Sequence, residues 1–125
     1  MKLRILDDSI RLRLSQSDVR QVEETGLVEG RTRFPGGAVF TYALQVLDPG
    51  PAGAAYSSDR LVVSLPQTEI VNWASDETAV SIHSEVDLPD GDSLRLLVEK
   101  DFRCLTERPD EDQTDLFSNP ESREC

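Results

Sequence analysis

The residues best suited to metal chemistry lie near the C-terminus of the chain. They are Cys104, Asp110, Asp112, Asp115 and Cys125. Thiolates are soft ligands for zinc or iron, and carboxylates are hard ligands for Ca²⁺ or Mg²⁺. The acids do not match a calcium-binding loop, because the third acid comes one position late and no glycine follows it. A loose metal site built from these five residues is therefore one hypothesis.

Catalytic chemistry has little support in the sequence. His83 is the only histidine, and Glu85 follows it on the same face of a predicted strand. A general base needs such a carboxylate partner and also a pocket, and an exposed strand histidine is the commoner case. Nucleophile elbows, zinc-protease motifs, phosphate loops and dinucleotide-binding glycine patterns are all missing from the sequence. We therefore expect a protein that is not an enzyme and has no cofactor.

Basic side chains occupy the outward positions of the first predicted strands. The candidate interaction residues are Arg4, Arg11, Arg13, Arg31 and Arg33, with Lys2 beside them. They would form a basic stripe if those strands were neighbours. An anionic ligand, an acidic face of another protein or the chain's own acidic tail could pair with the stripe. The tail is the simplest partner, because groups on one chain meet at high effective concentration.

The first elements follow from alternation and from helix-capping residues. Leu3 and Ile5 share one face, and the pattern resumes from Ile10 to Leu14, which predicts a strand pair around a polar turn or one long strand with a break. Ser15 to Asp18 has the spacing of a capping box, and Gly26 suits a helix C-cap. Residues 27–34 and 39–46 then predict a hairpin around Pro-Gly-Gly.

The second half repeats this order. Leu61 to Leu65 predicts a strand, Pro66 stands where a helix begins, and Ile70 and Trp73 would form the buried side of that helix. A second hairpin follows, turning at Asp90-Gly91. We therefore predict an internal repeat of residues 10–47 and 61–100. The alternative is two unrelated units that look alike because the same patterning rules shaped both.

These elements predict an α+β fold with six or seven strands and two helices. The favoured form is a small pseudo-symmetric mixed β-barrel or sheet built from two strand-helix-strand-strand units, since closure removes free edges. An open sheet with both helices on one side is the alternative form. Residues 1–105 would form a single domain, and residues 106–125 an irregular acidic C-terminal extension that packs in part against it.

Composition limits the choice of partner and compartment. The chain has 125 residues, with 13 Lys and Arg against 24 Asp and Glu, giving a formal net charge of −11. The excess of acids lies after residue 65. An acidic protein repels phosphate backbones, so we expect no nucleic-acid partner. No apolar run has the length of a membrane span, and the N-terminus lacks a secretory h-region. The chain has two cysteines, too few for a disulfide framework, which favours a reducing cytoplasm. The sequence leaves the oligomeric state open.

The two ends of the chain have distinctive sequences, MKLRILDDSIRLRLSQSDV at the start and LRLLVEKDFRCLTERPDEDQTDLFSNP at the end. The resemblance that rests on them is to a family of small uncharacterised bacterial proteins. Its most specific part is EKDFxCL followed by the acidic EDxxDxF-NP segment, and it covers nearly the whole length. No activity, ligand or partner comes with this resemblance. It does imply that Cys104, Asp112, Asp115, Phe117, Asn119 and Pro120 belong to a defined structure.

Two hypotheses from different classes follow. The first is a small soluble protein-interaction or accessory module, without catalytic activity, that contacts a protein partner through a sheet face or the acidic tail. The second is a metal-binding protein that uses the acidic segment from Cys104 to Cys125. Neither composition nor motif spacing decides between them.

Overall fold

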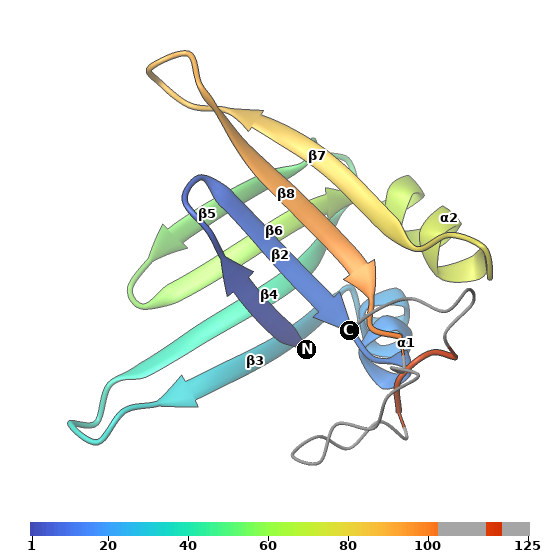
Figure 1. Cartoon of the computed structure of the whole chain (residues 1–125), viewed down its shortest axis with the longest axis horizontal. Coiled ribbons are helices and arrows are strands. Elements are labelled where there is room, and N and C mark those ends of the chain that lie inside the picture. Colours follow the sequence, from blue (N-terminus) through green and yellow to red (C-terminus); the bar gives the residue numbers. More distant parts are fainter. Residues whose placement is uncertain (103–114, 119–125) are drawn as a thin grey trace.

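The computed structural model describes residues 1–102 and 115–118. Eight strands and two helices lie in this part of the chain (Figure 1). In chain order they are β1 (Lys2–Ile5), β2 (Ser9–Leu14), α1 (Gln16–Thr25), β3 (Leu27–Arg33), β4 (Val39–Leu47), β5 (Gly53–Ser57), β6 (Arg60–Pro66), α2 (Gln67–Ser75), β7 (Ser81–Asp87) and β8 (Ser93–Lys100).

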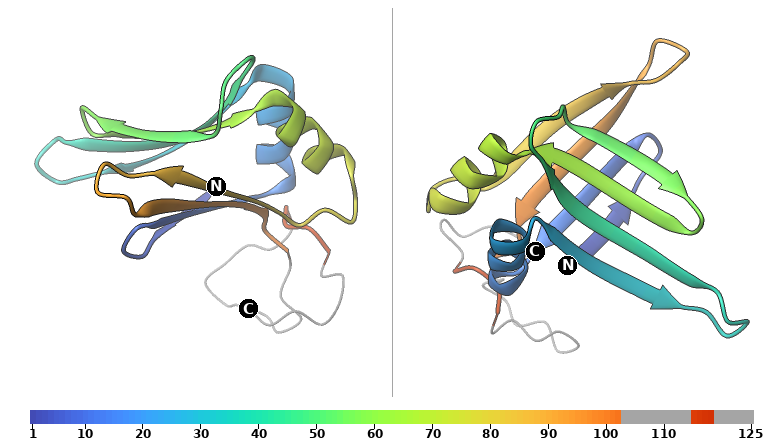
Figure 2. Two further views of the ribbon diagram at one scale, coloured as in Figure 1. Left: turned by 90° about the horizontal axis from the view of Figure 1, so that it is seen from above. Right: turned by 180° about the vertical axis from the view of Figure 1, so that it is seen from behind.

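The strands form two four-stranded mixed sheets, in the orders β1-β2-β8-β7 and β3-β4-β6-β5. In each sheet the two central strands run parallel and each outer strand is antiparallel to its neighbour. The sheets stack as two layers (Figure 2). The predicted closed barrel is therefore wrong, because no ladder between described strands joins the edges β1 and β7 to the edges β3 and β5. The single open sheet is wrong as well.

Both helices lie at one end of the two layers, and each connects a strand of one sheet to a strand of the other (Figure 2). Helix α1 begins with the predicted capping box of Ser15 and Asp18 and ends at Gly26, whose φ of 81° is left-handed. Helix α2 begins after Pro66, as predicted. The helices therefore close one end of the space between the sheets.

The core fills the space between the sheets and contains residues from both halves. The inward residues of β2 and β8 are buried, as the alternation predicts. The main cluster is Ile10, Leu12, Leu14, Val19, Val22, Val28, Leu44, Leu61, Val63, Leu65, Ile70, Trp73, Ile82, Leu96 and Val98. Trp73 also donates its indole N–H to the Val80 carbonyl over 3.0 Å. Successive residues of a strand point to opposite faces, so the residues of β2 and β8 that alternate with these inward ones face outward.

The two halves have the same element order of hairpin, helix and hairpin. The first hairpin of each half joins the last hairpin of the other half to complete a sheet. Strand β5 has no counterpart among the predicted strands, so residues 1–102 and 115–118 contain eight strands instead of the predicted six or seven. Its sequence, Gly-Ala-Ala-Tyr-Ser, has small residues of low strand propensity and no clear apolar alternation.

None of the helices in the described ranges is long and apolar enough to cross a membrane.

Candidate functional site

The outward face of the β1-β2-β8-β7 sheet gathers four arginines. Arg11 and Arg13 alternate with the buried residues of β2, so both point away from the core. Strand pairing places Arg4 directly beside Arg11 and places Arg95 beside Ser9 on the same face. We call Arg4, Arg11, Arg13 and Arg95 the arginine face. It contains residues from both ends of the described sequence, because β2 and β8 are parallel neighbours.

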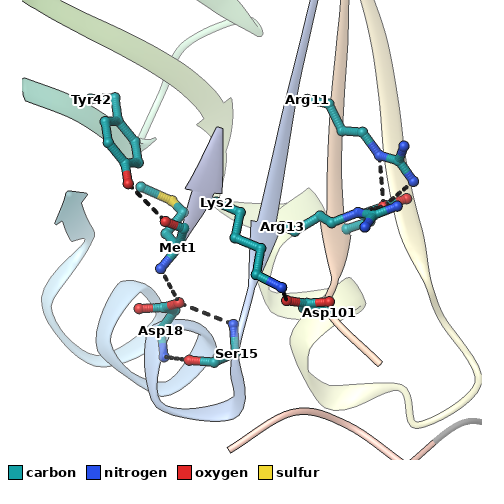
Figure 3. Close-up of polar contacts among 9 residues, drawn as sticks. Met1, Lys2, Arg11, Arg13, Ser15, Asp18, Tyr42 and Asp101 are labelled. Carbon is teal, nitrogen blue, oxygen red and sulfur yellow. Dashed lines mark hydrogen bonds and ion pairs between the residues drawn. The ribbon is translucent and has the colours of Figure 1, made fainter. Parts of the chain in front are cut away.

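A buried carboxylate holds two of these arginines. Glu99 is 4% exposed, and its Oε1 accepts 2.7 Å hydrogen bonds from Arg11 Nε and from Arg13 Nε. Charge-assisted bonds of this kind are short and strong, so they fix the direction of both guanidinium groups (Figure 3). Sequence reasoning missed Glu99. Its position opposite Arg13 could be recognised only once β2 and β8 were known to pair.

Three contacts hold the edge strand β1 in place, and with it Arg4. The N-terminal ammonium of Met1 lies 2.9 Å from the Asp18 carboxylate, and the Tyr42 hydroxyl donates to the Met1 carbonyl over 2.8 Å (Figure 3). Lys2 Nζ forms a 2.8 Å ion pair with the buried Asp101. A four-residue edge strand would otherwise be free to fray, so these contacts give Arg4 a defined position.

Two hollows open on this face. The larger has a volume of about 600 Å³ and is lined by Arg4, Leu6, Ser9, Ile10, Arg11, His83, Ser84, Glu85, Arg95, Leu96 and Leu97. The smaller has a volume of about 180 Å³ and is lined by Lys2, Leu3, Arg4, Arg11 and Arg13. We call them the large pocket and the small hollow. Arg4 and Arg11 line both, so the two hollows adjoin.

The positive charge of this face is only partly neutralised. Arg11 and Arg13 share a single carboxylate, that of Glu99. Arg4 and Arg95 are exposed, and no ion pair between residues in the described ranges involves either of them. Guanidinium groups bind carboxylates and phosphates in bidentate fashion. The arrangement is therefore suited to binding an anion next to the apolar side chains of the large pocket.

The structure divides the predicted interaction residues between the two sheets. Arg4, Arg11 and Arg13 lie together, whereas Arg31 and Arg33 lie on β3 of the other sheet. The five residues therefore do not form one stripe. Among the described residues, Glu99 pairs with Arg11 and Arg13, and Asp101 pairs with Lys2; both acids lie close to the end of β8. Of the predicted partner tail, residues 106–125, the structure describes only 115–118.

Of the predicted metal ligands, only Asp115 is described. Its carboxylate accepts a hydrogen bond from the Ser17 hydroxyl, and its carbonyl accepts one from the Gln16 amide over 3.0 Å. The bond from Ser17 lowers the pKa of Asp115. Asp115 thus accepts hydrogen bonds from groups in the first turn of α1, a role normally filled by capping residues. Within residues 1–102 and 115–118, no three His, Cys, Asp or Glu side chains converge to hold a metal.

The other four predicted ligands are Cys104, Asp110, Asp112 and Cys125, and all lie outside the described residues. Metal binding by the segment from Cys104 to Cys125 stays a prediction. Asp115 and Phe117 do belong to a defined structure, as the resemblance implied, and Phe117 donates its amide to the Asp101 carbonyl over 2.8 Å. Asp112, Asn119 and Pro120 also lie outside the described residues.

His83 and Glu85 lie at the β7 side of the large pocket. Both are exposed, and no hydrogen bond or ion pair joins them to each other in the described part of the chain. The Ser9 hydroxyl, which also lines the pocket, donates to the Leu6 carbonyl over 2.7 Å. These groups do not form the nucleophile-and-base pair that acyl or phosphoryl transfer requires.

Comparison with known proteins assigns a family. No curated protein and no solved structure matches the chain. A family model matches residues 1–121, which is nearly the whole length and includes every residue of the arginine face. The chain therefore belongs to DUF7009, a family of unknown function.

Proposed function

We propose that this protein is a non-enzymatic protein-interaction module whose arginine face binds an acidic segment of a partner protein. The observation that carries the proposal is the pair of exposed arginines, Arg4 and Arg95, that line the large pocket. Neither has a partner among the ion pairs of the described residues. An acidic segment would supply the missing carboxylates.

The contrast between this face and the rest of the protein supports the proposal. The chain has a formal net charge of −11, yet three arginines and one carboxylate, that of Glu85, line the large pocket. The net negative charge of the chain repels an acidic partner at long range, and these arginines attract it locally. Charge complementarity of this kind sets orientation and association rate more than affinity. Contact with Leu6 and Leu97 would contribute the apolar part of the binding energy.

The non-enzymatic part of the proposal rests on the side chains around the pocket. Arginine binds and orients anions, but it stays protonated and cannot act as a general base. Ser9 donates its proton to a backbone carbonyl rather than to a basic side chain. Binding, rather than proton transfer, is the chemistry that this set of residues favours.

We also infer that the chain arose from a duplicated unit of hairpin, helix and hairpin. The support is the shared element order and the reciprocal exchange of hairpins between the sheets. The units would be somewhat longer than residues 10–47 and 61–100, because β1 and β5 precede them. A bacterial origin and a cytoplasmic location remain part of the proposal, supported by the sequence resemblance and the low cysteine content.

Two matched double variants test the interaction. Arg4→Ala with Arg95→Ala removes two charges from the arginine face, and Arg31→Ala with Arg33→Ala removes two from the other sheet. A fluorescein-labelled peptide rich in glutamate and leucine is titrated with each protein, and anisotropy gives the Kd. We expect the first variant to bind at least about tenfold more weakly and the second to stay within about twofold.

Salt provides a second readout, since exposed charge pairs are screened above about 0.1 M. Wild-type affinity should fall between about 20 and 200 mM salt, and the variant of Arg4 and Arg95 should lose most of that dependence. Equal affinity of the two double variants for the peptide would overturn the proposal.

A further inference from the structure

The small hollow is lined almost entirely by cations. It lies over the β1–β2 pairing, where Arg4 is the direct neighbour of Arg11 and Lys2 is the direct neighbour of Arg13. Paired strands are about 4.8 Å apart, so these side chains leave the sheet close to one another. Like charges placed directly opposite are destabilising. Their presence here therefore needs compensation, and within the described part of the chain Glu99 and Asp101 provide some of it.

The remaining charge can be counted. Lys2 and Asp101 form one ion pair and are left out of the count. Arg4, Arg11 and Arg13 bring three positive charges against the one negative charge of Glu99. Among the described side chains, these four therefore carry a residual charge of +2. A carboxylate would neutralise one unit of it, whereas a phosphate monoester carries about −1.5 to −2 at pH 7.

The donors needed by a phosphate are still free to bind. Arg11 uses Nε and Nη2 on Glu99, and Arg13 uses Nε. A guanidinium has five N–H donors, so both arginines keep donors for a further acceptor. Glu99 also holds their planes in place, which reduces the ordering that a ligand would have to impose. A tetrahedral anion with three terminal oxygens fits several such forks better than a planar carboxylate does.

The neighbouring large pocket adds an apolar surface beside the small hollow. It shares Arg4 and Arg11 with the small hollow and adds the apolar side chains of Leu6 and Leu97. Its volume of about 600 Å³ is ample for an aromatic ring and the residues beside it. A ligand whose phosphate adjoins an apolar group would thus occupy both hollows at once.

We propose that the acidic group recognised by the arginine face is the phosphoryl group of a phosphorylated side chain on the partner protein. The phosphate binds in the small hollow, between Arg4, Arg11 and Arg13, and the carbon part of the side chain lies in the large pocket. This inference rests on the proposed function, and it specifies the chemistry of the partner at that same site.

Three labelled peptides of one sequence test it, with phosphotyrosine, glutamate or tyrosine at the central position. The full chain is titrated into each, and anisotropy gives the Kd. We expect the phosphotyrosine peptide to bind about tenfold more tightly than the glutamate peptide, because it places twice the charge in the small hollow. The tyrosine peptide should bind most weakly.

Arg13→Lys is the sharpest variant, because Arg13 lines the small hollow and not the large pocket. It keeps the charge beside Glu99 and the fold, but it loses the bidentate fork. We expect a fivefold to tenfold loss, as an order of magnitude, for the phosphotyrosine peptide and a smaller loss for the glutamate peptide, whose carboxylate has fewer oxygens to engage the fork. Arg31→Lys on the other sheet is the matched control and should change neither value.

The outcomes separate the two proposals. If the phosphotyrosine and glutamate peptides bind equally and both need Arg4, this inference is overturned and the proposed function stands. If neither peptide distinguishes Arg4→Ala from Arg31→Ala, the proposed function fails as well. Competition with inorganic phosphate is the last experiment. If it displaces the labelled phosphopeptide at the same concentration as the unlabelled phosphopeptide does, the site is an isolated anion site and the proposed partner is wrong.

Discussion

Arg13 and Glu99 are direct partners on the parallel strands β2 and β8, and Arg13 Nε donates to Glu99 Oε1 over 2.7 Å. The Glu99 side chain is 6% exposed and that of Arg13 is 33% exposed. The pair therefore places a desolvated carboxylate beneath a partly solvated guanidinium. A buried charge of this kind depends on its partners, because water cannot replace them.

Removing the charge of Glu99 should lower stability. Glu99→Gln keeps the size of the side chain but leaves Arg11 and Arg13 close together without a carboxylate between them. We expect the free energy of unfolding to fall by about 2 kcal/mol, measured by urea denaturation. Glu29→Gln is the matched control, since Glu29 pairs with Arg60 but is 41% exposed, and it should cost less than about 1 kcal/mol. An equal loss of unfolding free energy in Glu99→Gln and Glu29→Gln would show that burial does not make the Glu99 contacts more important.

Gly30 and Tyr42 are direct partners across β3 and β4, and the tyrosine ring lies over the glycine. A Cβ at position 30 would come within 2.6 Å of Tyr42 Oη, and Tyr42 is held by its bond to the Met1 carbonyl. Gly30→Ala should therefore overpack this contact and cost about 1–3 kcal/mol in urea denaturation. Gly36→Ala is the control, because no atom lies within 4 Å of its added Cβ. A near-neutral Gly30→Ala would show that the ring moves aside freely.

Local structure could be predicted from short stretches of the sequence alone. The alternation of Ile10, Leu12 and Leu14 predicted which face of β2 is buried, and Ser15 with Gly26 marked the two ends of α1. Each of these signals acts within a few residues of the chain. Such signals depend on side-chain periodicity and backbone conformation, which do not require knowledge of the partner strand.

Pairing between distant strands could not be read in the same way. The basic register of β1, β2 and β3 was visible, but nothing in it indicated that β3 belongs to the other sheet. Arg95 and Glu99 joined the site only through the parallel pairing of β2 with β8. Alternating patterns fix which way a side chain faces, and they do not fix which strand is its neighbour.

The contact of Asp115 with Ser17 should depend on pH. The Ser17 hydroxyl donates to the Asp115 carboxylate and lowers its pKa below the ordinary aspartate value of about 3.9. The charged form thus stabilises the docked segment above that pH, and the contribution is lost as pH falls through the lowered pKa. NMR shifts of the Ser17 and Leu116 amides should follow one transition with a midpoint below about pH 3.9. Asp115→Asn should abolish it, and a midpoint above that value would contradict the contact.

Lys100 should give a pH dependence of the same sign at high pH, with stability rising as pH rises. It is 4% exposed, its Nζ donates to the Asp76 carbonyl over 2.9 Å, and Nζ lies 5.6 Å from the ring centres of Trp73 and Phe117. Burial lowers its pKa, although the charges of Asp76 and Glu77 oppose that shift. The unfolded chain, with an ordinary lysine pKa near 10.4, therefore keeps its proton to higher pH than the folded chain does.

Stability rises with pH wherever the unfolded state binds more protons, so deprotonation of Lys100 favours folding as pH approaches about 10.4. Lys100→Met removes this titration and keeps an unbranched chain of similar length. Urea denaturation of both proteins at several values between about pH 8 and 10.4 gives the difference in their free energies of unfolding. Other titrating groups cancel in that difference, so it should shift in favour of the wild type as pH rises. Parallel pH profiles would show that the folded and unfolded states titrate Lys100 alike.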